Sequence, residues 1–176
     1  MTAWRKSLGG RVELETITIV NPDETQFDEL LPDLIRVYQS AYRDLPPYYS
    51  DHGLARVSDY LRWLYEGEPE GFFVALDRGV PVGFVSLHSE KHGWHGDLIG
   101  ELQEVVTDPD CQGKGIGREL ITRSLRYAAD RGRDRVRLWV GERNSRAANL
   151  YRRLGFVTLS QHGMWERMEL VLATNQ

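Results

Sequence analysis

The sequence predicts one mixed α/β domain, and three observations carry that prediction. Hydrophobic residues alternate with polar ones in several short runs, which is typical of strands in a sheet with one buried face. Other runs place hydrophobic residues three and four positions apart, as amphipathic helices do. The third observation is a glycine-rich turn within 107–120, which joins a predicted strand to a predicted helix.

In chain order, the elements that the pattern predicts are a strand at 12–20, a helix from Asp23, a loop at 44–53, a helix from Leu54, a break at 67–71, strands at 72–76 and 82–87, a polar loop at 89–97, a strand at 102–107, a helix at 116–131, a strand at 136–140, a short helix at 144–154, and strands at 156–159 and 166–172. Asp23 and Gln26 form a capping-box pattern that opens the first helix. Pro32 falls inside that helix, so we expect it to kink the helix or to reset its start.

The composition limits the classes of protein that fit. The 176 residues suit a single domain over 1–176, with a loosely held tail at 1–10, and no apolar run reaches the length of a membrane span. A formal charge of −4 argues against nucleic-acid binding through a basic surface. One cysteine excludes an intramolecular disulfide, and the N-terminus lacks the apolar core of a signal peptide, so we expect a cytoplasmic protein. Its oligomeric state stays open, a homodimer included.

The glycine-rich turn has the properties of an anion-binding site. Gly113, Gly115 and Gly117 lack Cβ atoms, so the backbone there can approach a ligand closely. The helix start behind them presents unpaired N–H groups and the positive end of the helix dipole. Their spacing matches neither a P-loop nor a dinucleotide-binding fingerprint. A phosphate or pyrophosphate group is therefore the expected ligand.

Two motifs together resemble those of the GCN5-related N-acetyltransferase (GNAT) family. The first is Gln-x-x-Gly-x-Gly at 112–117, preceded by Asp108-Pro109, and the second runs from Asn144 through Tyr151 to Gly155-Phe156. The resemblance covers the chain from about Gly71 to its end. It implies the GNAT fold, a mixed, mostly antiparallel and twisted sheet of about seven strands, splayed between the fourth and fifth and flanked by about four helices.

The resemblance also implies acetyl-coenzyme A (acetyl-CoA) as cosubstrate. In the family, the strand before the glycine-rich loop parts from the following strand, and the pantetheine arm pairs with the backbone exposed there. The cofactor-binding positions that it implies in this sequence are Val105, Val106, Thr107, Gln112, Gly113, Lys114, Gly115, Ile116, Gly117, Arg118, Asn144, Asn149 and Tyr151. An ordinary strand–turn–helix unit without a ligand is the alternative interpretation.

The reaction implied by the resemblance transfers the acetyl group directly to a primary amine, on a small molecule or a protein, in a ternary complex. An alkylamine with a pKa on the order of 10 must first lose a proton, and the departing thiolate gains from a proton donor. Tyr151 occupies the family's donor position, although a buried structural tyrosine is the alternative. Glu101 and Glu104 are candidate bases; strand alternation separates them to opposite faces unless a bulge intervenes. We prefer Glu101, and water chains could replace either.

Other candidates have weaker patterns. His88, His92 and His95 lack the spacing of a metal site, so we expect no metal. Cys111 has no base partner in the sequence and is expected to be an incidental thiol. The residues in the regions that form the acceptor wall in the family are Tyr42, Tyr48, Tyr49, Asp51, His52, Trp63 and Trp94, with core packing the stronger explanation for Tyr42 and Trp63. Two other functions stay open, a catalytically silent acyl-CoA-binding regulatory module and a nucleotide-dependent enzyme.

Overall fold

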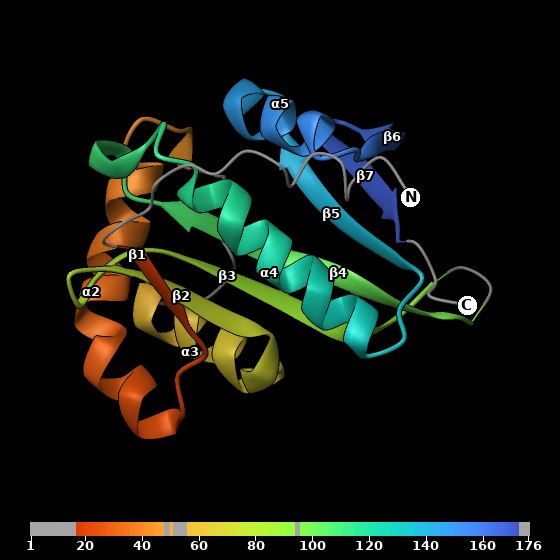
Figure 1. Cartoon of the computed structure of the whole chain (residues 1–176). Helices are drawn as coiled ribbons and strands as arrows, with labels where there is room; N and C mark the ends of the chain where they lie inside the picture. Colours follow the sequence, from red (N-terminus) through yellow and green to blue (C-terminus); the bar gives the residue numbers. More distant parts are fainter. Residues whose placement is uncertain (1–16, 48–49, 51–55, 94–95, 173–176) are drawn as a thin grey trace.

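The computed structural model describes residues 17–47, 50, 56–93 and 96–172. Its centre is one seven-stranded sheet with the strand order β1-β2-β3-β4-β5-β7-β6 (Figure 1). The strands are β1 (Ile17–Val20), β2 (Phe72–Asp77), β3 (Val80–His92), β4 (Leu98–Thr107), β5 (Arg135–Gly141), β6 (Val157–His162) and β7 (Trp165–Val171). The helices are α2 (Glu24–Tyr42), α3 (Val57–Gly67), α4 (Ile116–Asp130) and α5 (Ser145–Arg153).

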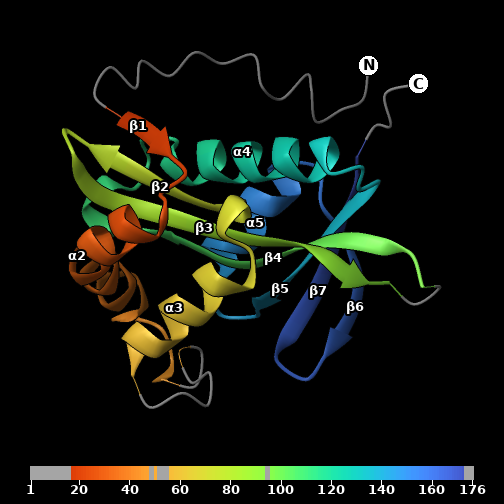
Figure 2. The ribbon, with the colours of Figure 1, turned by 90° about the horizontal axis from the view of Figure 1, so that it is seen from below.

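The helices cover the sheet from both sides. Figure 2 shows α4 along one face, with α2 and α3 on the opposite face. Each face has its own hydrophobic cluster. The cluster under α4 and α5 includes Leu120, Leu138 and Tyr151, whereas the cluster under α2 and α3 includes Phe27 and Phe84. Burial of these side chains, at roughly 25 cal/mol per Å² of apolar surface removed from water, is the main stabilising force of the fold.

The sheet opens between β4 and β5. These two strands form its only parallel pair among the described residues, and the pairing covers just Gly100–Leu102 of β4 against Val136–Leu138 of β5. β4 continues to pair with β3 as far as Thr107, and β5 pairs with β7 as far as Gly141. Beyond this short pairing, the facing edges of β4 and β5 have no strand partner among the described residues. The two strands diverge toward the start of α5 (Figure 1).

A β-bulge lies in β4 at the point where the sheet opens. Leu102 pairs with Leu87 and Glu104 pairs with Ser86, so Gln103 is an extra residue with no partner in β3. A bulge of this kind reverses the alternation of side chains along the strand. Glu101 and Glu104 therefore share the face covered by α2 and α3, instead of lying on opposite faces.

Most of the elements predicted from the sequence form. The predicted mixed α/β class and splayed sheet are confirmed. The capping box at Asp23 is present, with Asp23 Oδ1 accepting from the Gln26 N–H and the Gln26 side chain accepting from the Asp23 N–H. Pro32 does not reset the start of α2, which runs through it. The predicted first strand is described only from Ile17, since residues 12–16 lie outside the described ranges.

The predicted polar loop at 89–97 is wrong for its first four residues. β3 continues to His92, which pairs with Leu98. Ser89 is buried, but both its N–H and its hydroxyl donate to the Glu68 carboxylate, at 2.5 Å each. Because a buried polar residue is tolerated when its hydrogen bonds are made, Glu68 allows a polar stretch to continue as a strand. The sequence pattern alone does not reveal this partner.

Candidate functional site

The glycine-rich turn forms an open cradle at the start of α4. Gly113 and Gly115 have φ angles of 83° and 81°, a left-handed conformation that residues with a Cβ atom adopt at a cost. Gly115 caps α4 without a side-chain hydrogen bond, so the first N–H groups of the helix have no side-chain acceptor from the cap. Asp108 holds the other end of the turn, because it accepts from Arg36 at 2.9 Å and from the Asp110 N–H at 3.1 Å.

A cavity of about 530 Å³ adjoins this cradle. Its walls come from β4, the glycine-rich turn, α4 and α5, and they include Val105, Thr107 and Asn144. Three arginines of the α5 region, Arg143, Arg146 and Arg153, line it as well, beside Arg118 of α4. A helix N-terminus with several guanidinium groups around it is suited to a ligand that carries phosphates.

The backbone of β4 presents hydrogen-bonding groups to this cavity. The Asp108 N–H donates to the Val82 carbonyl in β3, at 2.8 Å. Because backbone groups alternate in direction along an antiparallel pair, the N–H and C=O groups of Thr107 and Val105 point away from β3, toward the gap. Val106 lines the cavity too, but the same alternation turns its backbone groups toward β3. An extended ligand can therefore pair with β4 at Val105 and Thr107.

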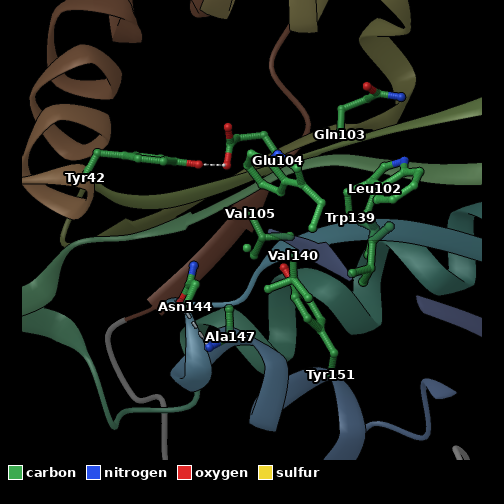
Figure 3. Close-up of a pocket in the computed structure, with 13 residues that line it drawn as sticks. Tyr42, Leu102, Gln103, Glu104, Val105, Trp139, Val140, Asn144, Ala147 and Tyr151 are labelled. Carbon is green, nitrogen blue, oxygen red and sulfur yellow. Dashed lines mark hydrogen bonds between the residues drawn. The ribbon is translucent and has the colours of Figure 1, made fainter. Parts of the chain in front are cut away.

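A smaller cavity of about 150 Å³ lies within the gap itself. Figure 3 shows the residues around it, with Glu104 and Tyr42 on one side and Asn144 and Tyr151 on the other. Tyr42, Val105, Asn144, Ala147 and Tyr151 line this cavity and the larger one. The gap therefore continues the larger cavity toward Glu104.

Among the described residues, Glu104 is the one acid that lines the smaller cavity. Its side chain is buried, and its two oxygens accept hydrogen bonds from Tyr42 Oη at 2.8 Å and Tyr60 Oη at 3.0 Å. Burial raises the pKa of Glu104 to about 7, and the two tyrosine hydroxyls and the Val105 N–H oppose that rise. A carboxyl group with this pKa is half ionised near neutral pH, which is the condition for efficient general-base catalysis.

Tyr151 lies on the other side of the gap. It projects from α5, is almost fully buried, and packs edge-on against Phe156, with ring centroids 5.8 Å apart. Its hydroxyl points into the space between Val105 and Val140 (Figure 3). Burial, and to a lesser extent the charge of Glu104, raise the pKa of Tyr151 above its ordinary value. The hydroxyl is therefore protonated at neutral pH and can donate a proton.

Glu101 has a different environment. It pairs with His88 of β3 and Arg137 of β5, below the point where the strands part. Its carboxylate accepts from the Gln103 side chain at 2.9 Å, and it does not line either cavity. The preference for Glu101 as base therefore has no support in the geometry, which brings Glu104 to the gap instead.

The structure brings together most of the predicted cofactor-binding residues and leaves two outside. Those that line the larger cavity are Val105, Val106, Thr107, Gln112, Gly113, Gly115, Ile116, Gly117, Arg118, Asn144 and Tyr151. Lys114 and Asn149 are exposed and line neither cavity. Asn144 Oδ1 accepts from the Ala147 N–H at 3.2 Å, so this residue caps α5 and also faces the gap. Cys111 lines the cradle end of the cavity, away from Glu104.

Several residues at the site were missed or undervalued in the sequence. Tyr42 packs against Tyr38, as predicted, but its hydroxyl also bonds Glu104. Tyr60 carries no signal, because its partner is 44 positions away. For Trp139 the sequence does contain a signal. Val136, Leu138 and Val140 face the core, so strand alternation places the Trp139 side chain on the opposite face. There it is 41% exposed beside the gap. Trp63 is 46% exposed, more than core packing explains.

The remaining sequence expectations concern the other residues of the acceptor wall, a metal site and a membrane span. Tyr48, Tyr49, Asp51, His52, Trp94 and His95 lie outside the described residues. Within the described ranges, no group of three His, Cys, Asp or Glu side chains is placed to hold a metal ion. No helix among the described residues is long and apolar enough to cross a membrane.

Comparison with known proteins gives the family. The family model described as "Acetyltransferase (GNAT) family" matches residues 34–156. The chain belongs to the GNAT family of acetyltransferases. An uncharacterized N-acetyltransferase of Methanocaldococcus jannaschii is 37% identical over 160 residues, which are 88% of this chain and 67% of that protein. A mycothiol acetyltransferase of Thermobifida fusca is 35% identical over 173 residues, which are 94% of this chain but only 50% of the relative.

Solved structures share the GNAT fold. The crystal structure of PH1933 from Pyrococcus horikoshii superposes with a TM-score of 0.78 at 34% identity, covering 89% of this chain and 99% of that one. An acetyltransferase from Salmonella typhimurium, solved with its cofactor acetyl-CoA, has a TM-score of 0.69 at 20% identity, covering 91% of this chain and 96% of that one. The chain is thus a GNAT acetyltransferase, and the Salmonella typhimurium protein that shares its fold binds acetyl-CoA. The glycine cradle, the arginines and the unpaired β4 backbone fit that molecule.

Proposed function

We propose that this GNAT acetyltransferase moves the acetyl group of acetyl-CoA directly to a primary amine, on a small molecule or a protein, within a ternary complex. The observation that carries the proposal is the pairing of Glu104 and Tyr151 across one cavity in the open part of the sheet. One is a carboxyl group that can accept a proton near neutral pH, and the other is a hydroxyl that stays protonated there. Direct transfer to an amine is accelerated by both capacities.

Each group has one task in this proposal. Acetyl-CoA supplies the activated acetyl group and a thiolate leaving group. The cradle from Gln112 to Arg118 and the backbone of Val105 and Thr107 hold the cosubstrate. Glu104 takes a proton from the incoming ammonium group, and the free amine then forms the new N–C bond as the C–S bond breaks. Tyr151 gives its proton to the departing sulfur, and the second proton that the nitrogen loses as it becomes an amide returns to Tyr151.

The acceptor enters from the face of the sheet that carries α2 and α3. Glu104 points to that face, as Tyr42 and Tyr60 show by reaching it from α2 and α3. The exposed rings of Trp63 and Trp139 lie on the same face, on either side of β4. Aromatic surfaces stabilise cations through the negative faces of their rings. This arrangement favours an amine that arrives in its protonated form.

Thiol release tests the proposal. The protein is incubated with acetyl-CoA and a panel of primary amines that includes small polyamines, amino acids and peptides, and free thiol is measured. We expect acceptor-dependent release, acetylated amine by mass spectrometry, and initial-rate lines that intersect when both substrates are varied. Binding of acetyl-CoA without release for any amine would contradict the proposal, and parallel lines would contradict the ternary complex.

A second prediction concerns the cradle. Gly117 lines the larger cavity, and a Cβ atom there would lie 3.3 Å from Thr107 Oγ1 and 3.4 Å from Leu150 Cδ2. The branched side chain of Gly117→Val would occupy space beside the α4 N-terminus, so we expect acetyl-CoA to bind about tenfold more weakly or worse. Calorimetric titration measures this. Gly132→Ala, at the other end of α4, is the control and should lose stability but not affinity, because Gly132 has a φ of 77°. Equal affinity in folded Gly117→Val protein would remove the cradle from the binding site.

A further inference from the structure

The Glu104 carboxylate is held from two helices at once. Tyr42 is the last residue of α2 and donates to Oε1 at 2.8 Å, as the dashed line in Figure 3 shows. Tyr60 is in the first turn of α3 and donates to Oε2 at 3.0 Å. The two hydroxyls therefore occupy one lone pair on each oxygen, which fixes the plane of the carboxylate. The Val105 N–H also acts on this carboxylate, and the lone pairs that none of the three donors occupies are available to a substrate proton.

The charge of this carboxylate has no cationic partner within the described ranges of the chain. In the part of the chain that the structure describes, no lysine, arginine or histidine forms an ion pair with Glu104. The titratable groups that act on it from the packed elements are phenols, namely Tyr38 and Tyr42 of α2, Tyr60 of α3 and Tyr151 of α5. Ser86, its partner in β3, gives its hydroxyl to the Leu64 carbonyl. Among the described residues, the groups that stabilise the buried charge are Tyr42, Tyr60 and the Val105 N–H.

We propose that Tyr42 and Tyr60 are positioning residues for acetyl transfer, which orient the Glu104 carboxylate toward the gap and set the pH at which it becomes a base. The inference rests on the proposed role of Glu104. Hydrogen bonds that donate to a carboxylate favour its charged form. Both hydroxyls thus oppose the effect of burial, and loss of either one makes Glu104 hold its proton to higher pH. Neither tyrosine exchanges a proton with the substrate.

The test is the pH dependence of kcat/KM between pH 5.5 and 9 for Tyr42→Phe, Tyr60→Phe and the double variant. Each change keeps the ring and its packing and removes only the hydroxyl. Loss of a hydrogen bond to a charged carboxylate raises the pKa of that carboxyl group by about one unit or somewhat more. We therefore expect the midpoint of the acid limb to shift to higher pH by about that amount in each single variant, and further in the double variant. The plateau at high pH should stay within about threefold of the wild type. Tyr65→Phe is the control from the same helix, because Tyr65 Oη donates to the Pro22 carbonyl instead.

Three outcomes separate this inference from the proposed function. A shifted limb with an intact plateau in both single variants supports the positioning role. If the acid limb of the tyrosine variants does not shift, or if their kcat/KM falls equally at every pH, the positioning role is overturned. This holds even if Glu104→Gln has lost activity, in which case the role of Glu104 as base stands. Full activity of Glu104→Gln overturns the base role and the inference together. The pH dependence of the free energy of unfolding gives a test that needs no turnover. The pH range over which stability falls should extend to higher pH in Tyr60→Phe than in the wild type, and an unchanged range would contradict the inference.

Discussion

Glu104→Gln should lower kcat/KM by about 10²- to 10⁴-fold, which is the usual contribution of a general base. The carboxylate is the base form, so wild-type activity should rise with pH to a plateau with a midpoint near 7, the pKa that burial gives Glu104. Glu104→Gln has no carboxyl group at position 104, so its residual activity should lack the rise with a midpoint near pH 7. The measurement is a pair of pH–rate profiles at saturating acetyl-CoA.

Glu101→Gln is the matched control, because Glu101 is on the same strand and the same face but lines neither cavity. We expect its activity to stay within about threefold of the wild type. Loss of activity in Glu101→Gln, with Glu104→Gln unaffected, would restore the assignment that the sequence favoured.

Glu104→Gln should also change how the stability of the folded protein depends on pH. The Glu104 pKa is about 7 in the folded protein and 4.5 ordinarily, so the folded state holds a proton more tightly than the unfolded state. Stability is therefore lost as pH rises from 4.5 to 7, and the difference corresponds to roughly 3 kcal/mol. The free energy of unfolding can be measured with denaturant at pH 5 and pH 8. Between these two values, that of the wild type should fall relative to that of Glu104→Gln by an amount of this order. Parallel pH dependence of the two proteins would contradict the raised pKa.

The second large effect is expected from Tyr151→Phe, with kcat lowered by about 10²-fold or more. The phenylalanine keeps the ring against Phe156 and in the core, and removes only the hydroxyl that points into the gap. Because a proton donor for a leaving group acts in the transition state, acetyl-CoA affinity should change less than about threefold. Steady-state kinetics and calorimetric titration together measure this separation.

Tyr127→Phe is the matched control for Tyr151→Phe. Tyr127 projects from α4, and its hydroxyl donates to Glu68 at 2.6 Å, outside both cavities. It should lose stability and keep kcat. Equal turnover in the wild type and Tyr151→Phe would leave Tyr151 a structural tyrosine, the alternative that its sequence position allows.

The glycine-rich turn and the helix start behind it could be predicted from the sequence, because they depend on local conformation. Gly113 and Gly115 adopt the positive φ angles that their residue type allows. The helix that follows them places its N-terminus at the cavity by chain connectivity alone. Asn144 caps α5 through its own neighbour Ala147, which is again a local contact. Such features are encoded within a few residues and need no knowledge of the tertiary fold.

The position of Glu104 at the gap could not be predicted, because it depends on one extra residue in β4. The bulge at Gln103 reverses the alternation between Glu101 and Glu104, and no residue type in that stretch announces it. The partners of Glu104 come from α2 and α3, 62 and 44 positions earlier in the chain. Likewise, β3 extends through a polar stretch because Glu68 satisfies Ser89 from a distant turn. Contacts at this sequence distance appear only when the elements are placed in space.

The most direct test of the account is a crystal structure of the protein with acetyl-CoA. We expect the pyrophosphate against the N–H groups from Gly113 to Gly117, the pantetheine chain bonded to the backbone of Val105 and Thr107, and the thioester between Tyr151 and Glu104. A cosubstrate bound elsewhere, or β4 and β5 paired along their whole length with the thioester outside the gap, would contradict it.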